Sequence, residues 1–167
     1  DSLCRQTCKD FVWLIVDDGS SDNTKEIVEK WMANDNGFEI RYVYKQNGGM
    51  HTGHNKAYEL IDTELNVCID SDDFMPDDAV ELIVNFWEEN KDSSYSGILA
   101  LDVYKNGQVI GKELPNKKST TLSGYYQNGG QGDKKLIYRT EIINKYPSYP
   151  EFEGEKFVPL DYKYLLA

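Results

Sequence analysis

Three short hydrophobic runs divide the first half of the chain, and each is followed by a polar turn and a segment with helical spacing. The runs cover residues 11–16, 40–44 and 67–69. Short, continuous runs rich in β-branched residues are typical of buried strands. The segments after them place apolar residues three and four positions apart, which predicts amphipathic helices. Strand and helix alternating three times predict a parallel sheet with right-handed crossovers.

The pattern changes after residue 96. The run at 97–101 predicts a further strand, and Asn106-Gly107 between apolar residues predicts a hairpin. Residues 115–133 are rich in small polar residues and indicate a long mobile loop. Shorter elements are expected near the end of the chain: a strand at 136–138 and helices at 140–145 and 161–166.

Three carboxylates follow the third hydrophobic run. Asp70, Asp72 and Asp73 lie between the predicted strand and a helix that begins near Pro76, and this edge of an open α/β sheet is where ligands bind. Two unit charges about 4 Å apart repel by roughly 4 kcal/mol at an effective dielectric constant near 20, so we expect a proton or a cation among them. Mg²⁺ or Mn²⁺, with substrate phosphates completing the shell, fits such oxygen ligands. The alternative is a solvated acidic turn that caps the helix.

The composition limits the class of protein. The chain has 167 residues, 40% of them hydrophobic and 28% charged, which fits one globular domain and not a disordered chain. A net charge of −11 argues against nucleic acid and anionic membrane as partners, so a phosphate substrate needs a metal or local basic groups. No apolar run approaches the ~20 residues of a membrane span. Cys4, Cys8 and Cys68 complete no zinc motif, and we expect reduced thiols and a cytoplasmic location.

Polar segments also follow the first two runs. The first run ends in Asp17-Asp18-Gly19, where the glycine permits a tight turn. The second precedes a glycine-rich loop over residues 45–56 that contains His51 and His54. Glycines let a backbone approach phosphates, but this loop is neither GxGxxG nor a P-loop. Each histidine has an alternative role as a structural hydrogen-bonding residue.

Taken together, these segments resemble the family 2 glycosyltransferases, whose catalytic domain has the GT-A fold. The resemblance rests on four segments: Gln6–Thr24, Asn47-Gly48-Gly49 with Asn55, Asp70-Ser71-Asp72-Asp73, and Gly154–Phe157. It implies an α/β fold with a Rossmann-like, mostly parallel central sheet, helices on both faces and a small antiparallel β extension. Residues 1–167 are then one catalytic domain.

The resemblance implies a site for a nucleotide sugar and a divalent cation. Asp18 matches the family position that contacts the nucleotide base, and residues 70–73 match the DXD motif that holds the cation and the sugar nucleotide. His54 stands where the family often has Arg. We assign Mn²⁺ or Mg²⁺ to Asp72 and Asp73. The expected contacts of the nucleotide sugar are Asp17, Asp18, Asn47, Gly48, His54, Asn55, Asp70, Ser71 and Asp72.

Two acids are candidates for the catalytic base. Glu155 lies in the acidic motif of the resembled family, where Gly154 lets the backbone turn and aim the carboxylate into the cleft. Asp161 has a structural explanation, because it can cap the helix that begins after it. A surface ion pair between Glu155 and Lys156 is the alternative, and it would contribute little. We favour Glu155 as the base that takes the proton of the acceptor hydroxyl, an effect worth roughly 10²–10⁴-fold.

The implied activity is inverting transfer of a sugar from a nucleotide-sugar donor to a saccharide or lipid-linked acceptor, with membrane association only through that acceptor. We expect a UDP-sugar, because the Asp18 carboxylate can accept a hydrogen bond from uracil N3–H, which adenine and cytosine lack. Guanine also offers an N–H, so a GDP-sugar stays open. The alternatives are a nucleotidyltransferase-like enzyme and a non-catalytic sugar-nucleotide binding module.

The resemblance also predicts that the chain is a core fragment. The family begins with a strand and a helix, and residues 1–10 have the character of the end of that helix. We therefore expect the first strand of the family to be missing, and the family continues past Ala167.

Overall fold

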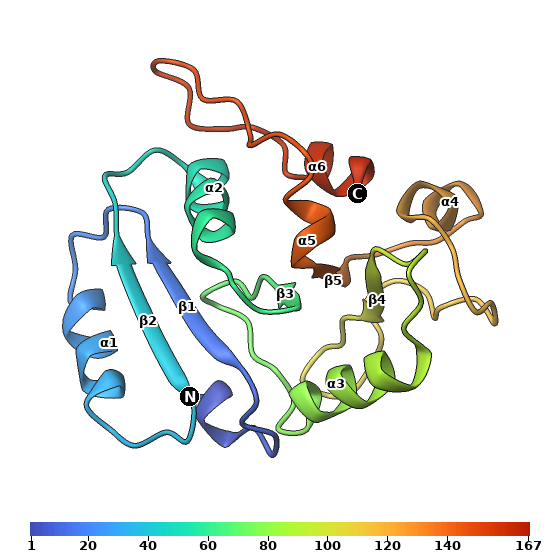
Figure 1. Ribbon diagram of the computed structural model, residues 1–167, viewed down its shortest axis with the longest axis horizontal. Coiled ribbons are helices and arrows are strands. Elements are labelled where there is room, and N and C mark those ends of the chain that lie inside the picture. The colour runs from blue at the N-terminus through green and yellow to red at the C-terminus, as the bar shows by residue number, and fades with distance from the viewer.

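The first two hydrophobic runs form neighbouring parallel strands in the computed structural model, which describes all 167 residues (Figure 1). β1 (Val12–Asp17) and β2 (Glu39–Tyr44) are joined by α1 (Thr24–Met32). The register pairs the last residues of the two strands, so their carboxyl ends lie at one edge. α1 packs against β2 and buries Val28. The helical and strand periods of this part are confirmed.

The remaining strands form a second, antiparallel sheet. β3 (Leu65–Val67), β5 (Lys134–Arg139) and β4 (Gly97–Leu101) lie in the order β3-β5-β4. The α/β class is confirmed, but the parallel part has two strands and not the three that alternation alone predicts. β3 pairs with β5, a partner that lies far along the chain. The edge of β1 that faces away from β2 is paired with no other strand, and neither is the edge of β3 that faces away from β5.

The helices cover the two sheets unevenly (Figure 1). α2 packs against β1 and α5 follows β5 directly. The predicted hairpin forms at Asn106-Gly107, where Val103 and Val109 bridge. No helix is both long and apolar enough to span a bilayer. The bounds of the helices other than α1 are α2 (Met50–Leu60), α3 (Ala79–Asn90), α4 (Leu122–Gln127), α5 (Thr140–Ile143) and α6 (Asp161–Leu166).

Residues 115–133 contain α4 and are not the continuous loop that their composition predicts. Tyr125 in this helix is 3% exposed, and Thr121 caps it by accepting from the Gly124 amide at 2.9 Å. Lys134 holds the end of the segment, because its Nζ donates to the carbonyls of Ile110, Gln131 and Asp133 at 2.8, 3.0 and 3.0 Å. One buried tyrosine and one buried lysine therefore order a polar segment.

Residues 1–10 form a single 3₁₀ turn, η1 (Leu3–Arg5), and not the expected end of an α-helix. Gln6 follows it and is buried. Its Nε2 donates to the Pro76 carbonyl at 2.7 Å, and its Oε1 accepts from the Val80 amide at 2.9 Å. These bonds tie the beginning of the chain to the beginning of α3.

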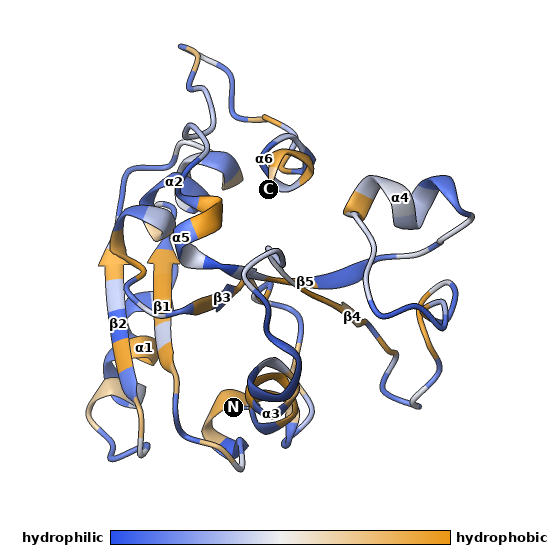
Figure 2. Cartoon of the chain, turned by 45° about the vertical axis from the view of Figure 1, so that its right-hand side comes forward, coloured by the Kyte–Doolittle hydropathy of each residue, from blue (hydrophilic) through white to orange (hydrophobic).

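The hydrophobic core lies mainly around the second sheet and the C-terminal segment. Ile137, Ile143 and Tyr149 are at most 2% exposed, and Trp87 of α3 is 4% exposed. The apolar residues of β1, in contrast, are only half-buried, although Figure 2 shows that β1 is largely hydrophobic. The functional loops therefore sit on a scaffold that is better packed on the side of β5 than on the side of β1.

Candidate functional site

Asp17 shapes the turn after β1 from inside. It is 5% exposed, and its carboxylate accepts from the Tyr42 hydroxyl at 2.6 Å and from the Ser20 amide at 2.7 Å. Burial opposes ionisation, but these hydrogen bonds outweigh it and keep the pKa of Asp17 below its usual value. The hydrogen bond between Tyr42 and Asp17 raises the pKa of Tyr42 to about 12. The carboxylate of Asp17, a predicted contact of the nucleotide sugar, is thus bound by groups of the protein itself.

Asp18 joins the turn after β1 to the loop after β2. Its carboxylate accepts from the amides of Gly48 and Gly49 at 3.0 and 2.8 Å and from Asn47 Nδ2 at 3.2 Å, and it forms an ion pair with Lys45. Burial raises its pKa, but the bonds from Lys45 and the two amides bring it below the usual value. Four donors use most of the acceptor capacity of an ionised carboxylate. Any further donor would have to displace one of these four or share a carboxylate oxygen with it.

Close backbone contact makes this junction possible. Gly19 has φ +83°, and a Cβ there would lie 2.7 Å from the backbone nitrogen of Asn47. Only glycine fits such a position without strain. Asn47 also donates from Nδ2 to the carbonyl of Asp18 at 2.7 Å. The structure therefore brings together three predicted residues, Asp18, Asn47 and Gly48, at the carboxyl edge of the parallel strands.

Lys45 is the residue of this junction that the sequence did not single out. It follows β2 directly, and its amide donates to the Asp17 carbonyl at 2.9 Å. Its Nζ donates to Thr52 Oγ1 at 2.6 Å as well as pairing with Asp18. The sequence did hold a signal for this role of Lys45. The lysine follows one predicted parallel strand, and Asp17-Asp18 lies at the end of the neighbouring one.

His54 lies on α2, among residues that this helix buries. It is 9% exposed, and its Nε2 is 3.9 Å from Cys68 Sγ. Burial lowers its pKa most, the charge of Asp70 opposes this, and the charge of Lys163 adds to it. A neutral imidazole therefore occupies the position where the resembled family often has Arg. Lys163 is 2% exposed and lies over the Tyr58 ring, 4.4 Å from its centroid, so a cation reaches this region from α6.

The carboxylates after β3 occupy an exposed turn. The Asp73 amide donates to the Asp70 carbonyl at 3.0 Å, and Asp70, Ser71, Asp72 and Asp73 are all exposed. Asp73 Oδ2 lies 3.7 Å from Lys135 Nζ. No hydrogen bond or ion pair joins this turn to Asp18. The charge of Asp70 does affect the pKa of His54.

The carboxylates of this turn fit a hard cation whose other ligands come from a substrate and from water. No three His, Cys, Asp or Glu side chains are arranged to hold a metal together. Mg²⁺, however, is commonly bound through one or two carboxylates with phosphates and water in the other positions. Asp72 and Asp73 supply two exposed carboxylates at neighbouring positions. Lys135 competes for Asp73 in the absence of a cation.

The two candidate bases lie in one segment after α5. Glu155 is exposed, and its Oε1 accepts from the Phe157 amide at 2.8 Å. Asp161 is the first residue of α6, whose N-cap position is occupied by Leu160. Asp161 makes no side-chain capping bond, so its predicted structural explanation is wrong. A capping role for Asp161 therefore no longer favours Glu155 as the base. The preference for Glu155 rests on its position in the resembled motif.

The predicted alternative for Glu155, an ion pair with Lys156, is not observed. Lys156 Nζ instead donates to Asn47 Oδ1 at 2.5 Å. The segment that carries Glu155 therefore contacts the loop that binds Asp18.

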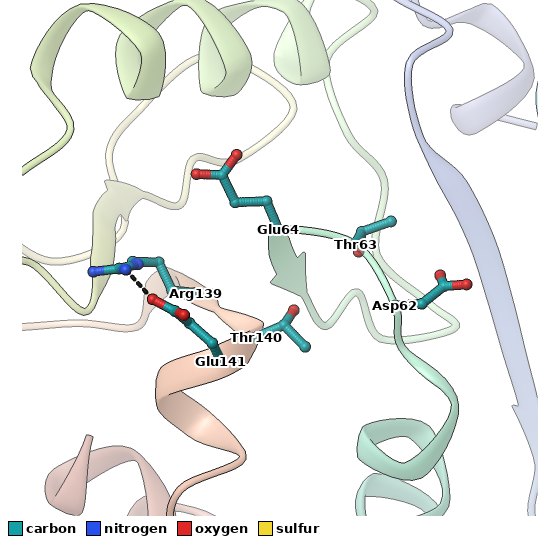
Figure 3. Close-up of a pocket in the computed structure, with 6 residues that line it drawn as sticks. All are labelled: Asp62, Thr63, Glu64, Arg139, Thr140 and Glu141. Atoms are coloured by element: carbon teal, nitrogen blue, oxygen red, sulfur yellow. Dashed lines mark hydrogen bonds and ion pairs between the residues drawn. The ribbon is translucent and has the colours of Figure 1, made fainter. Parts of the chain in front are cut away.

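A separate open pocket of about 450 Å³ lies at the beginning of β3 and the end of β5 (Figure 3). Its lining consists of Asp62, Thr63, Glu64, Arg139, Thr140 and Glu141. Arg139 pairs with Glu141 and donates to the carbonyls of Ser93 and Tyr95, and Glu64 accepts from Trp87 Nε1 at 2.7 Å. These charged groups already have protein partners, and none of the predicted site residues lines this pocket.

The α/β scaffold, with polar loops at the carboxyl edge of two parallel strands, defines a protein of the GT-A type, and comparison with known proteins agrees. The model of the family described as "Glycosyl transferase family 2" matches residues 1–146. The chain belongs to this family.

Individual relatives support the assignment. A chondroitin synthase of Pasteurella multocida (strain Pm70) is 31% identical over 126 residues, which is 72% of this chain and 13% of the relative. Glycosyltransferase GlyG of Streptococcus pneumoniae serotype 4 is 30% identical over 159 residues, 95% of this chain and 48% of the relative. The chain thus spans less than half of the length of these two relatives.

A solved structure shows the same fold. TarS of S. aureus, residues 1–349 in complex with UDP, superposes with a TM-score of 0.61 at 25% sequence identity. The alignment covers 86% of this chain and 42% of the TarS chain.

Proposed function

We propose that this chain is the donor-binding part of an inverting glycosyltransferase that transfers a sugar from a UDP-sugar to a saccharide or lipid-linked acceptor. The observation that carries the proposal is the junction of Asp18 with the loop after β2, at the edge of the sheet where α/β proteins bind ligands. The similarity to TarS, a protein whose structure contains UDP, supports the binding of a nucleotide. The three free thiols fit a reducing compartment such as the cytoplasm.

The proposed donor site extends from Asp18 to the exposed acidic turn. Asp18 contacts the uracil ring, and Asp70 lies near the ribose or the sugar. Asp72 and Asp73 hold Mn²⁺ or Mg²⁺. A bound divalent cation supplies Lewis-acid neutralisation of the diphosphate leaving group. Lys135 lies 3.7 Å from Asp73 and 3.8 Å from Asp102, so it would keep Asp102 as a partner if a cation took Asp73.

The proposed chemistry is a single displacement. The carboxylate of Glu155 takes the proton from the acceptor hydroxyl, and the acceptor oxygen forms the new bond to the anomeric carbon. The bond between that carbon and the phosphate oxygen breaks, and the diphosphate leaves with the electron pair. One displacement inverts the anomeric configuration and needs no covalent enzyme intermediate.

Calorimetric titration of the protein with UDP and Mn²⁺ tests the donor site. We expect binding that requires the metal and that prefers UDP to CDP and ADP, because uracil has a ring N3–H that can donate to a carboxylate, and cytosine and adenine lack such a ring N–H. Asp72→Ala and Asp73→Ala should each weaken UDP–Mn²⁺ binding by at least about tenfold, the loss that follows from about 1.4 kcal/mol.

Glu81→Ala, at an exposed carboxylate on α3, is the matched control and should leave binding unchanged. If Asp72→Ala and Asp73→Ala bind UDP–Mn²⁺ as tightly as the parent, the metal assignment is wrong. A clear preference for CDP or ADP contradicts the assignment of Asp18. Binding without turnover on a panel of donors and acceptors would instead identify a sugar-nucleotide binding module.

A further inference from the structure

Asn55 is buried in α2 and has used its hydrogen-bonding groups within the protein. It is 8% exposed. Its Nδ2 donates to the carbonyl of Tyr149 at 2.9 Å, and its Oδ1 accepts from the amide of the same residue at 2.8 Å. A second bond from Nδ2 reaches Glu151 Oε1 at 3.0 Å. The side chain thus binds one backbone residue at both of its polar groups, and no donor atom of the carboxamide is left for a sugar nucleotide.

The backbone that Asn55 binds leads directly to both candidate bases. Tyr149 is 2% exposed, and its hydroxyl donates to the Leu160 carbonyl at 2.8 Å. Leu160 immediately precedes Asp161 and α6. Tyr149 therefore fixes the position of the end of the segment as well as its beginning. Figure 1 shows this segment, between α5 and α6, extending toward the side of the molecule where α2 begins.

A second contact holds the middle of the segment. Lys156 Nζ donates to Asn47 Oδ1 at 2.5 Å, and a Cβ on Gly49 would lie 2.1 Å from the Lys156 carbonyl oxygen. Gly49 has φ +94°, which glycine adopts without strain. The segment is thus held at Tyr149 and at Lys156, and Glu155 lies between these two points.

We propose that Asn55 is a positioning residue of the transfer reaction. It anchors residues 149–161, which bear Glu155 and Asp161, to α2, and it does not contact the nucleotide sugar. This inference rests on the proposed function, and it replaces the sequence-based expectation that Asn55 binds the donor. It predicts that loss of the anchor moves the base and leaves the donor site intact.

Variants of the whole protein separate positioning from donor binding. Asn55→Asp keeps the acceptor for the Tyr149 amide, loses the donor to its carbonyl and places a charge beside Glu151. We expect kcat to fall by at least about tenfold, because small misplacements of a reacting group cost up to about 10²-fold. The dissociation constant of UDP–Mn²⁺ should stay within about twofold of the parent. Amide hydrogen exchange should become faster at residues 149–161 and stay unchanged at residues 45–49.

Three further variants complete the test. Glu151→Gln keeps an acceptor for Asn55 and should behave like the parent. Combined with Asn55→Asp, it removes the repulsion between two carboxylates and should recover part of the lost kcat. Tyr149→Phe removes only the bond to Leu160, so it should lower kcat without weakening UDP–Mn²⁺ binding, even if changes at Asn55 prevent folding.

The outcomes are distinguishable. If Asn55→Asp weakens UDP–Mn²⁺ binding while exchange at residues 149–161 stays at the parent rate, Asn55 is a donor contact and the proposal is overturned. Unchanged kcat with faster exchange also overturns it, because the anchor then has no role in the reaction. If the parent protein binds no UDP–Mn²⁺ at all, the proposed function fails, whereas the exchange data still report on the anchor.

Discussion

Asp17 and Asp18 are neighbours in the sequence with different surroundings. Asp17 points into the protein, where Tyr42 and the Ser20 amide bind it. Asp18 points across to the loop after β2 and gathers Lys45 and two glycine amides. The alternation of side chains along an extended strand and its continuation explains the difference, since successive residues face opposite sides. Of the two carboxylates, only that of Asp18 faces the loop after β2 at this edge.

Glu155→Gln tests the base at the scale of one residue. A base touches the acceptor and not the donor, so its loss should lower kcat and spare donor binding. We expect kcat to fall by at least about 10²-fold in the whole protein, with UDP-sugar affinity nearly unchanged. Steady-state kinetics combined with calorimetry measure both quantities.

Asp161→Asn is the matched comparison, because Asp161 lies in the same segment and makes no capping bond. It should retain most of the activity. If Glu155→Gln turns over normally and Asp161→Asn does not, the two roles must be exchanged.

His54 should make stability depend on pH in mildly acidic solution. Its pKa is lowered in the folded protein, chiefly by burial, from the ordinary value of 6.5. Below pH 6.5 the unfolded chain therefore binds a proton that the folded protein does not, and the free energy of unfolding falls as the pH decreases. Urea denaturation at pH 7.5 and at pH values below 6.5 measures this loss, which His54→Gln should reduce.

The carboxylates provide a separate window for comparison. Asp17 and Asp18 have lowered pKa values, so their stabilisation is lost only as the pH falls below 3.8. They do not contribute to the difference above pH 5. An equal loss of stability in the parent and in His54→Gln would show that His54 is not the responsible group.

At the scale of elements, the segment over residues 103–133 depends on a few anchors. The backbone at Gly111 lies close to the backbone at residues 131–132. A Cβ on Gly111 would lie 2.1 Å from the Gln131 carbonyl oxygen and 2.6 Å from Gly132 Cα. Lys134 adds three bonds to carbonyls of this segment, and Tyr125 lies beneath its ammonium group. The segment is thus ordered by its two ends, while residues 115–121 carry no helix or strand.

Limited proteolysis should therefore cut first at residues 115–121 and only later within α4. We also predict that the segment orders over the donor, because polar segments with glycine often serve as lids. Saturating UDP-sugar and Mn²⁺ should then slow the cleavage. Lys134→Met, which keeps the length of the side chain and removes its donors, should accelerate cleavage throughout residues 110–133. Cleavage that is unaffected by the donor would identify a surface segment without a lid function.

At the scale of the whole molecule, the elements that local pattern determines were predictable and the distant pairings were not. Periodicity predicted β1, α1, β2 and α2, and the Asp70–Asp73 turn followed from the end of a hydrophobic run. Pairing of β3 with β5 depends on residues that lie far apart in the chain, and so do the contacts of Lys135 with Asp73 and of Asn55 with Tyr149. No local period encodes these contacts, because each of them needs the tertiary fold.

The negative charge of the whole chain predicts how stability responds to salt. With 29 acidic and 18 basic residues, the folded chain repels itself, and screening should relieve this. The Debye length falls from about 30 Å at 0.01 M to about 8 Å at 0.15 M. We expect the melting temperature to rise by roughly 2–4 °C between these conditions, which corresponds to about 1 kcal/mol for a chain of this size.

If screening is the cause, NaCl and KCl should raise the melting temperature equally at equal ionic strength. An uncharged solute at the same osmolality should not reproduce their effect. A melting temperature that decreases with NaCl would mean that attractive ion pairs, such as Lys45 with Asp18, outweigh the repulsion.

The edge of β1 that faces away from β2 has a consequence for handling the protein. Its amides and carbonyls are paired with no other strand, and its residues are largely hydrophobic and only half-buried. Such an edge is a template for the addition of further strands. Losses during purification should therefore grow with protein concentration and yield β-rich aggregates that bind thioflavin T. A lysine in place of Leu14, at the centre of this edge, should improve recovery from concentrated solutions even if it lowers the melting temperature.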